Sequence, residues 1–297
     1  MDGVVNVYKE KGYTSHDVIA ILRGVLETKK IGHTGTLDPQ AEGVLPICLG
    51  KATKVAEDIM GASKRYIADM AFGAETDTQD ASGEVTRTFS YEFDAAKVEE
   101  VVASFAGTYD QIPPMYSAIK KNGIKLYDLA RQGVEVERKA RPVTIFSIQL
   151  LENRPDGARI EVHCSKGAYI RTLCEDIGRR LGYGAYMTGL VRTASGPYTL
   201  ETARTIDQLR ELMRSGRQNE FLLSLDELFA DCPVYQIPEV DDKYLYNGNY
   251  LTYPAVDSMH KKDLVRMRDS KGMLIGLYQI QYIADGKMHL IPKRMFS

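Results

Sequence analysis

The segment IGHTGTLDPQAEGVLP, residues 31–46, is the most unusual stretch of the sequence. Three glycines, two prolines, one histidine and one aspartate fall within it, between an amphipathic helical pattern and an apolar run. Glycine permits tight turns and close backbone approach, and Pro39 restrains Asp38 to an extended conformation. We therefore expect a stiff loop that holds the Asp38 carboxylate in a fixed geometry. On composition alone, Asp38 could equally be a residue that caps a turn.

The regions around this segment alternate between strand and helix patterns. Thr14 or Ser15 is expected to cap the first helix, whose apolar residues recur at helical spacing up to residue 26. Strands are predicted at 4–8, 144–151 and 158–164, and later helices at 94–105, 170–181 and 206–213. The regular strand–helix–strand rhythm of a doubly wound fold is missing. The pattern therefore predicts a mixed α/β (α+β) fold with a largely antiparallel sheet.

The chain length of 297 residues favours two domains. An acidic stretch over 201–242 ends in Cys232-Pro233 and Pro238, which is typical of a linker. Beyond it we expect a small β domain with strands at 274–278, 280–283 and 288–291, and with turns at Gly272, Gly276 and Gly286. The predicted division is therefore 1–230 and 231–297.

Residues 112–142 have the composition of an inserted arm. Seven basic residues are interleaved with Tyr116 and Tyr127 after a Pro113-Pro114 pair; the basic residues are Lys120, Lys121, Lys125, Arg131, Arg138, Lys139 and Arg141. Basic side chains with exposed aromatics suit a surface that grips a phosphate backbone and stacks on a base. The alternative is an ordinary charged hairpin.

The net charge of −2 and the pI near 6.3 argue weakly against a nucleic-acid binder. The charge is unevenly distributed, however. Residues 112–145 contain seven basic and three acidic residues, residues 159–192 contain six and three, and residues 260–297 contain eight and three. These basic blocks could converge on one face and neutralise phosphates, or they could remain separate solvated surfaces.

Several protein classes are disfavoured by composition. The four cysteines form no C-x-x-C pair, the five histidines are dispersed, and the turn-rich segment 73–83 lacks the alternating acids of a calcium loop, so we expect no metal site. No apolar run approaches the ~18–20 residues that span a bilayer. The N-terminus lacks the layout of a signal peptide, so we expect a cytoplasmic protein with no membrane association.

The run G-H-T-G-T-L-D-P-x-A-x-G-V-L-P resembles the catalytic motif of the TruB-type tRNA pseudouridine-55 synthases. Five further matches to motifs of that family follow in the same order along the chain: Lys64–Tyr66, Gly73–Gly83, 112–133, Lys166–Leu173 and Gly189–Thr193. Together the matches span residues 3 to about 200. Residues 231–297 look like the small PUA-like RNA-binding domain of bacterial members, which makes 1–230 the expected catalytic domain and 112–142 its RNA-binding insertion.

The resemblance implies an enzyme that isomerises one uridine of the tRNA T arm to pseudouridine. The N1–C1′ bond breaks, the uracil turns, and C5 joins C1′. Because the product is an isomer, no redox carrier, ATP or metal is required, and we expect no cofactor. A carboxylate suits the role of nucleophile or base, and the motif assigns that role to Asp38. We expect a monomer that acts on tRNA by itself, without a partner protein.

The resemblance also implies roles for the residues around Asp38, which must stay ionised in a pocket shielded from water. Arg171 is the expected cationic partner, and its loss should also harm folding by ~3–5 kcal/mol. Tyr66 resembles the residue that stacks on the everted uracil. The remaining implied contacts are Tyr169 and Leu190 in the pocket wall, His33 on the RNA, and Lys9 beneath the catalytic loop. Relatives more often show Asp-Lys-Pro where this chain has Tyr8-Lys9-Glu10, which puts the role of Lys9 in question.

A purely structural role is the alternative for most of these residues. Arg171 could be a surface arginine on the first turn of a helix, and Tyr66 could be a core tyrosine on a strand. At the level of the whole chain, two other hypotheses are a non-catalytic module that binds or folds tRNA, and an Asp-nucleophile hydrolase that acts on small glycosides. The basic insertion and the C-terminal domain argue against the hydrolase.

Overall fold

The computed structural model describes residues 1–117, 119–121, 123–134 and 136–297. Ala118, Asn122 and Glu135 of the predicted insertion lie outside the described residues. The side chains of Lys120, Lys121, Lys125 and Arg131, which the sequence pattern assigned to RNA binding, also lie outside them.

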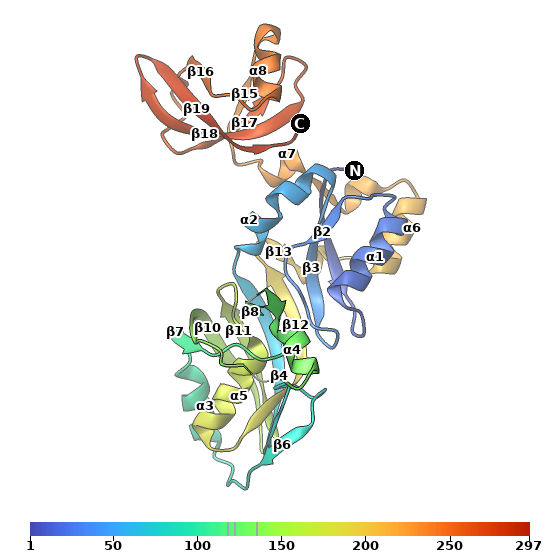
Figure 1. Cartoon of the computed structure of the whole chain (residues 1–297), viewed down its shortest axis with the longest axis vertical. Helices are drawn as coiled ribbons and strands as arrows, with labels where there is room; N and C mark the ends of the chain where they lie inside the picture. The colour runs from blue at the N-terminus through green and yellow to red at the C-terminus, as the bar shows by residue number, and fades with distance from the viewer. Residues whose placement is uncertain (118, 122, 135) are drawn as a thin grey trace.

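A ten-stranded sheet forms the centre of the molecule (Figure 1). Its main path is β14-β1-β3-β12-β4-β11-β10-β7, with β13 paired to β12 and β2 paired to β3. The strands are β1 (Gly3–Lys9), β2 (Ile31–His33), β3 (Glu42–Leu49), β4 (Lys64–Phe72), β7 (Gly107–Gln111), β10 (Arg141–Arg154), β11 (Gly157–Cys164), β12 (Ala185–Ser195), β13 (Tyr198–Thr199) and β14 (Leu222–Ser224). The β12–β3 pair is parallel, whereas the other strand pairs of this sheet are antiparallel. The predicted mixed fold with a largely antiparallel sheet is confirmed.

Helices cover this sheet because their apolar faces match its alternating strands. Every second residue of β4 is buried and the residues between are exposed or partly buried, as expected for a strand with one face on the core. The main apolar cluster joins β4, β11 and β12 to α3 (Ala95–Ala103) and α5 (Ile170–Leu181). Helix α1 (Ser15–Val25) packs on α6 (Ile206–Arg214) at the other end of the sheet.

The predicted ends of two helices are confirmed. Thr14 caps α1 by accepting a hydrogen bond from the backbone nitrogen of Asp17, and the Asp17 carboxylate accepts one from the backbone nitrogen of Thr14. Gly182 ends α5 in the left-handed conformation, with φ of 79°. These signals are local in sequence, so they could be recognised without knowledge of the tertiary structure.

A second, five-stranded sheet with its own apolar core occupies the C-terminal region. Its order is β15 (Val234–Gln236), β17 (Leu264–Arg268), β18 (Leu274–Ala284), β19 (Lys287–Met295) and β16 (Leu251–Pro254). The predicted break between strands 274–278 and 280–283 is wrong, because β18 runs through both with irregular register. Gly276 lies inside β18 rather than in a turn. A Cβ atom there would lie 2.7 Å from the Arg294 carbonyl oxygen, so the glycine allows β19 to approach.

A third apolar cluster joins the two sheets. Phe296 and Leu277 from the C-terminal region pack against β1, β3 and the segment between β3 and β4, which contains η1 (Gly50–Val55) and α2 (Ala56–Met60). Lys54 Nζ donates to the carbonyl oxygen of Met295 at 2.7 Å. The short elements after α6 are η3 (Gln218–Glu220) and α7 (Leu225–Leu228), and η2 (Leu200–Thr202) precedes it; η4 (Glu239–Asp241) and α8 (Asp242–Tyr246) follow β15.

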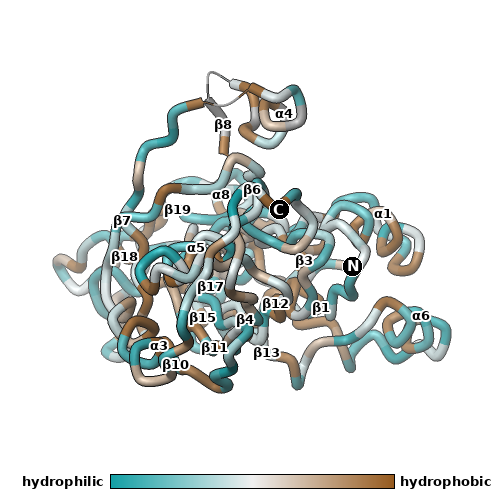
Figure 2. Tube along the Cα trace, turned by 90° about the horizontal axis from the view of Figure 1, so that it is seen from below, coloured by the Kyte–Doolittle hydropathy of each residue, from teal (hydrophilic) through white to brown (hydrophobic). Residues whose placement is uncertain are grey.

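Two smaller structures project from the central sheet. The ribbon β5 (Ala74–Thr76) and β6 (Val85–Thr88) encloses most of the turn-rich segment 73–83. The insertion forms the ribbon β8 (Lys120–Lys121) and β9 (Ile124–Lys125), followed by α4 (Leu126–Arg131). Figure 2 shows α4 and β8 standing away from the body of the protein. In the described part of the chain, no helix is both long and apolar enough to cross a membrane.

Candidate active site

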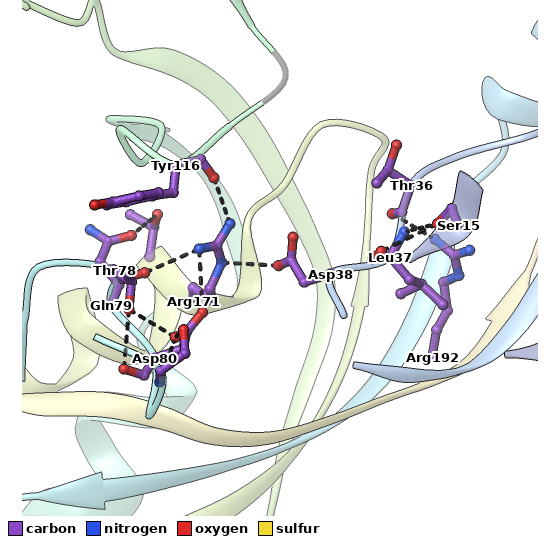
Figure 3. A network of polar contacts seen from close by, with 12 residues as sticks. Ser15, Thr36, Leu37, Asp38, Thr78, Gln79, Asp80, Tyr116, Arg171 and Arg192 are labelled. Atoms are coloured by element: carbon purple, nitrogen blue, oxygen red, sulfur yellow. Dashed lines mark hydrogen bonds and ion pairs between the residues drawn. The ribbon is translucent and has the colours of Figure 1, made fainter. Parts of the chain in front are cut away.

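Asp38 lies in the loop between β2 and β3 and makes an ion pair with Arg171 (Figure 3). The distance from Asp38 Oδ2 to Arg171 Nε is 3.1 Å. The two partners differ in exposure: the Arg171 side chain is 7% exposed and the Asp38 side chain is 41% exposed. The predicted pocket shielded from water is therefore wrong for the protein alone, because the loop holds the carboxylate at an accessible edge. The pair combines a buried, fixed cation with a carboxylate that a substrate can reach.

Arg171 is fixed by contacts at each of its guanidinium nitrogens. Nη1 donates to the carbonyl oxygen of Thr78 at 3.1 Å and contacts Asp80 Oδ2 at 3.3 Å, and Nη2 donates to the carbonyl oxygen of Tyr116 at 2.8 Å. These partners come from the segment after β5 and from the insertion. The burial of Arg171 on the first turn of α5 excludes the surface-arginine alternative.

Asp80 is a site residue that the sequence analysis missed. Its Oδ2 pairs with Arg171, while its Oδ1 accepts hydrogen bonds from the Thr78 hydroxyl at 2.8 Å and the Ser82 backbone nitrogen at 2.9 Å. In the sequence it belongs to the matched family motif Gly73–Gly83, which assigns no role to it individually. The signal was the density of hydroxyl and carboxyl groups in 73–83, which form a local network around one carboxylate.

Lys9 lies beneath the Asp38 loop and is fully buried. Its Nζ donates to three backbone carbonyl oxygens: Tyr13 at 2.7 Å, Glu10 at 3.1 Å and Pro39 at 3.3 Å. Burial lowers the pKa of Lys9 from 10.5 to about 8, although the nearby carboxylate of Asp38 opposes this effect. Lys9 therefore contacts the residue that follows Asp38, even though its neighbours depart from the family pattern.

Tyr66 and Tyr169 both lie within electrostatic range of Asp38. Burial raises the pKa of Tyr66, while the charge of Arg192 lowers it and that of Asp38 raises it. Burial also raises the pKa of Tyr169, which Arg171 lowers and Asp38 raises. Both phenols are therefore neutral at physiological pH. Tyr66 is 8% exposed and belongs to the main apolar cluster, so it is a core tyrosine in the protein alone.

The other two predicted residues lie at the margins of this group. Leu190 is half-buried on β12, opposite Ala68 of β4 and next to the main core. His33 is half-buried at the end of β2, with its ring edge-on to that of His16 at 5.5 Å. Burial and the charges of His16 and Arg192 lower the pKa of His33, so its imidazole is neutral near pH 7. His33 therefore offers a hydrogen-bonding ring rather than a charge.

A cavity of about 550 Å³ lies between the insertion and α5, on the far side of the Arg171 contacts. Its lining includes Gln79, Tyr116, Arg138 and Glu175. Among the described residues, no group of three or more histidine, cysteine or acidic side chains is arranged to hold a metal ion. The chemistry that this site offers is that of a fixed carboxylate beside a guanidinium and two neutral phenols.

Comparison with known proteins identifies relatives over the full chain. The family model for the N-terminal domain of the TruB family pseudouridylate synthases matches residues 23–170, and the model for the C-terminal domain of tRNA pseudouridylate synthase B matches residues 171–230. A tRNA pseudouridine synthase B of Lachnoclostridium phytofermentans is 46% identical, with both chains covered completely. One from Alkaliphilus oremlandii is also 46% identical and covers 88% of this chain and 87% of its own length.

Solved structures give the same picture at greater distance. The structure of an H/ACA RNP bound to a substrate RNA containing 2′-deoxyuridine superposes with a TM-score of 0.71 at 25% identity, covering 99% of this chain and 85% of that chain. The crystal structure of a Cbf5-Nop10-Gar1 complex superposes with a TM-score of 0.70 at 27% identity and the same coverage.

Proposed function

Because the chain belongs to the TruB family of pseudouridylate synthases and is a tRNA pseudouridine synthase, we propose that it acts on uridine 55 in the T arm of tRNA, with Asp38 as the catalytic carboxylate. One observation carries the assignment of Asp38. Its carboxylate is held 3.1 Å from the Arg171 guanidinium and is also 41% exposed. An acid that is oriented by a buried cation and open to solvent on one side can meet a reacting sugar or base.

The reaction needs an everted uridine, because the glycosidic bond of a stacked nucleotide is out of reach. Asp38 would act as nucleophile or base while the N1–C1′ bond breaks and the C5–C1′ bond forms. Arg171 would keep the carboxylate oriented and ionised, and its own fixed contacts with Thr78, Asp80 and Tyr116 support that role. The protein then supplies geometry and charge, and the isomerisation consumes no other reactant.

The surrounding residues would receive the nucleotide. Tyr66 would stack on the everted uracil, which requires its ring to become accessible when RNA binds. Tyr169 and Leu190 would form the wall of the pocket, and neutral His33 would contact the flipped nucleotide by hydrogen bonding. Lys9 would support the catalytic loop through Pro39. Each proposed role uses a chemical property that the side chain has at the position where it lies.

Catalysis and RNA binding would be divided between the two sheets and the insertion. Residues 1–230 would form the catalytic domain, and 231–297 would form a PUA-like domain that binds RNA. The insertion 112–142 would grip the T stem-loop, with exposed Lys139 and Arg141 against phosphates. The protein would act as a monomer, in the cytoplasm where its tRNA substrate matures.

Mapping of pseudouridine by chemical sequencing, after incubation with an unmodified tRNA transcript, tests this proposal. We expect modification at position 55 by the wild type and none by Asp38→Asn, with unchanged tRNA affinity. Asp226→Asn is the matched control, because Asp226 is also 41% exposed and also pairs with arginine, in the contact with Arg266 and Arg268. If the wild type and Asp38→Asn both bind tRNA and leave it unmodified, the protein is a non-catalytic RNA-binding module.

A further inference from the structure

Arg192 is a buried cation beside the catalytic loop to which no role has yet been given. It lies on β12 and is 2% exposed, and it is the largest of the fully buried side chains of the described chain. In the sheet register it stands opposite Tyr66 of β4 on one side and beside Gly43 of β3 on the other. It therefore occupies the point at which the catalytic loop returns to the sheet.

The guanidinium of Arg192 contacts the loop on both sides of Asp38, and Figure 3 shows it beside Thr36. Before Asp38, Nη2 donates to the Gly35 carbonyl oxygen at 3.2 Å and Nη1 to that of Thr36 at 3.5 Å. After Asp38, Nε donates to the Val44 carbonyl oxygen at 2.6 Å. One side chain thus fixes the spacing between the first part of the loop and the beginning of β3.

The remaining carbonyl groups near Asp38 also have donors. The Ser15 hydroxyl donates to the Leu37 carbonyl oxygen at 3.2 Å and accepts from the Leu37 nitrogen at 2.9 Å. The Asp38 carbonyl oxygen accepts from Ala41 at 3.1 Å, and that of Pro39 accepts from the nitrogen of Gly12 at 2.8 Å as well as from Lys9. Every backbone carbonyl from residue 35 to residue 39 therefore accepts a hydrogen bond. The backbone around Asp38 is fixed, and its side chain can move only by rotation about its own bonds.

The backbone of Gly43 adds a second restraint on the same limb. Its φ is 104°, and a Cβ atom there would lie 2.3 Å from the Arg192 carbonyl oxygen. Only glycine allows β3 to lie this close to β12. Among the described residues, the Arg192 guanidinium donates to three backbone carbonyl oxygens and also interacts with the Tyr66 phenol, whose pKa its charge and hydrogen bond lower. A buried cation is costly unless it is well hydrogen-bonded, so its position here is set by the loop carbonyls.

We propose that Arg192 is a positioning residue for the isomerisation: it fixes both limbs of the catalytic loop and thereby aims the Asp38 carboxylate at Arg171 and the substrate. This inference rests on the proposed function, because it assumes that Asp38 carries the reaction. Arg192 is buried, so it acts through the groups that it contacts, which are the loop carbonyls and the Tyr66 phenol. Its effect is therefore on the rate of the chemical step, because a misplacement of about 1 Å can cost about 100-fold in rate.

Single-turnover rates at saturating tRNA, measured beside tRNA dissociation constants, test the proposal. Arg192→Lys keeps the charge but loses the planar fork that spans three carbonyls. We expect its rate to fall by about 100-fold with the tRNA dissociation constant unchanged. Arg204→Lys is the matched control, since Arg204 is half-buried and its guanidinium also donates to backbone carbonyl oxygens, those of Glu201 and Ala203. We expect the control to keep the wild-type rate.

Chemical rescue separates positioning from general loss of structure. Free guanidinium ion, at concentrations below those that unfold the protein, should restore part of the rate of Arg192→Ala but none of that of Asp38→Asn. If Arg192→Ala does not fold, the lysine variant carries the test alone. A wild-type rate in Arg192→Lys, an equal loss in Arg204→Lys, or a parallel loss of rate and affinity would overturn the assignment. A wild type that forms no pseudouridine would instead overturn the proposed function, and this assignment with it.

Discussion

The catalytic loop, residues 33–44, and the insertion, residues 112–142, differ in how firmly they are held to the rest of the protein. In the loop, each carbonyl from residue 35 to residue 39 has a donor, and the donors come from α1, β1 and β12 as well as from the loop itself. By contrast, the described residues of the insertion contribute nothing to the three apolar clusters. A reacting carboxylate needs a fixed position, whereas groups that grip RNA must stay reachable.

The two regions nevertheless share one side chain. Arg171 contacts the Asp38 carboxylate through Nε and the Tyr116 carbonyl oxygen of the insertion through Nη2, at 3.1 Å and 2.8 Å. The ring of Tyr116 lies edge-on to that of Tyr127, with centroids 6.0 Å apart. A movement of the insertion on RNA would therefore reach Arg171 directly. The comparison predicts that changes near the loop alter turnover and that changes in the insertion alter affinity.

Tyr66→Ala should give the largest effect on the loop side of this comparison. Stacking of a base on an aromatic ring contributes ~1–3 kcal/mol, which corresponds to about 5-fold to 150-fold in the population of the everted state. We expect turnover to fall by that factor while tRNA affinity is nearly kept, because phosphate contacts dominate RNA binding. Filter binding and tritium release from labelled uridine measure the two quantities separately.

Two controls sharpen the test at Tyr66. Tyr66→Phe keeps the ring and should keep most of the turnover, whereas Tyr198→Ala removes another buried strand tyrosine and should reduce stability alone. Equal losses of turnover and affinity in Tyr66→Ala would contradict a stacking role. A loss in Tyr66→Phe as large as in Tyr66→Ala would place the function in the hydroxyl group.

Lys9 should make turnover depend on pH in the weakly alkaline range. Its pKa is lowered to about 8, so the ammonium group that supports Pro39 loses its charge as the pH rises through that value. The groups that surround it electrostatically are Asp38, Glu42, Asp17 and Arg192. We expect turnover to fall as the pH rises from about 7 to 9, with a decline of up to about tenfold per pH unit above the pKa.

Stability should change in the opposite direction over the same range. Because the folded pKa of Lys9 lies below its unfolded value of 10.5, the unfolded chain binds more protons between about pH 8 and 10.5. The contribution of this group to the free energy of unfolding therefore rises with pH in that window.

Burial also lowers the pKa of Lys64 to about 8, so Lys64→Met is the control for the effect of Lys9 on turnover. The alkaline decline in turnover should persist in Lys64→Met and disappear in Lys9→Met; its survival in Lys9→Met would remove Lys9 from the loop mechanism.

The sequence could predict the parts of the molecule that depend on neighbouring residues. The Thr14 cap, the Gly182 stop and the restraint of Pro39 on Asp38 are local, and the pairing of Asp38 with Arg171 followed from a family resemblance. The contact between Arg171 and Asp80 joins residues 91 positions apart, and Arg192 reaches carbonyls 148 to 157 positions away. In the sequence, Asp80 and Arg192 lie in the matched family motifs Gly73–Gly83 and Gly189–Thr193, but nothing local to either residue shows which distant group it contacts. The error at Gly276 has the same origin, because a glycine that admits a neighbouring strand has the same local signature as a glycine in a turn.

Substitutions in the insertion should give the smallest effect and the cleanest contrast with the loop. Lys139 and Arg141 are exposed, so their replacement by glutamine removes charge without disturbing a core. Each lost phosphate contact should flatten the slope of log affinity against log salt by about 0.9, and weaken binding by a few-fold at low salt. The single-turnover rate at saturating tRNA should not change.

Arg210→Gln on α6, where Arg210 pairs with Asp207, controls for loss of a surface charge. An unchanged salt slope in the double variant would reject the RNA-gripping role, whereas a reduced rate at saturating tRNA would show that the insertion also acts through Tyr116 on Arg171.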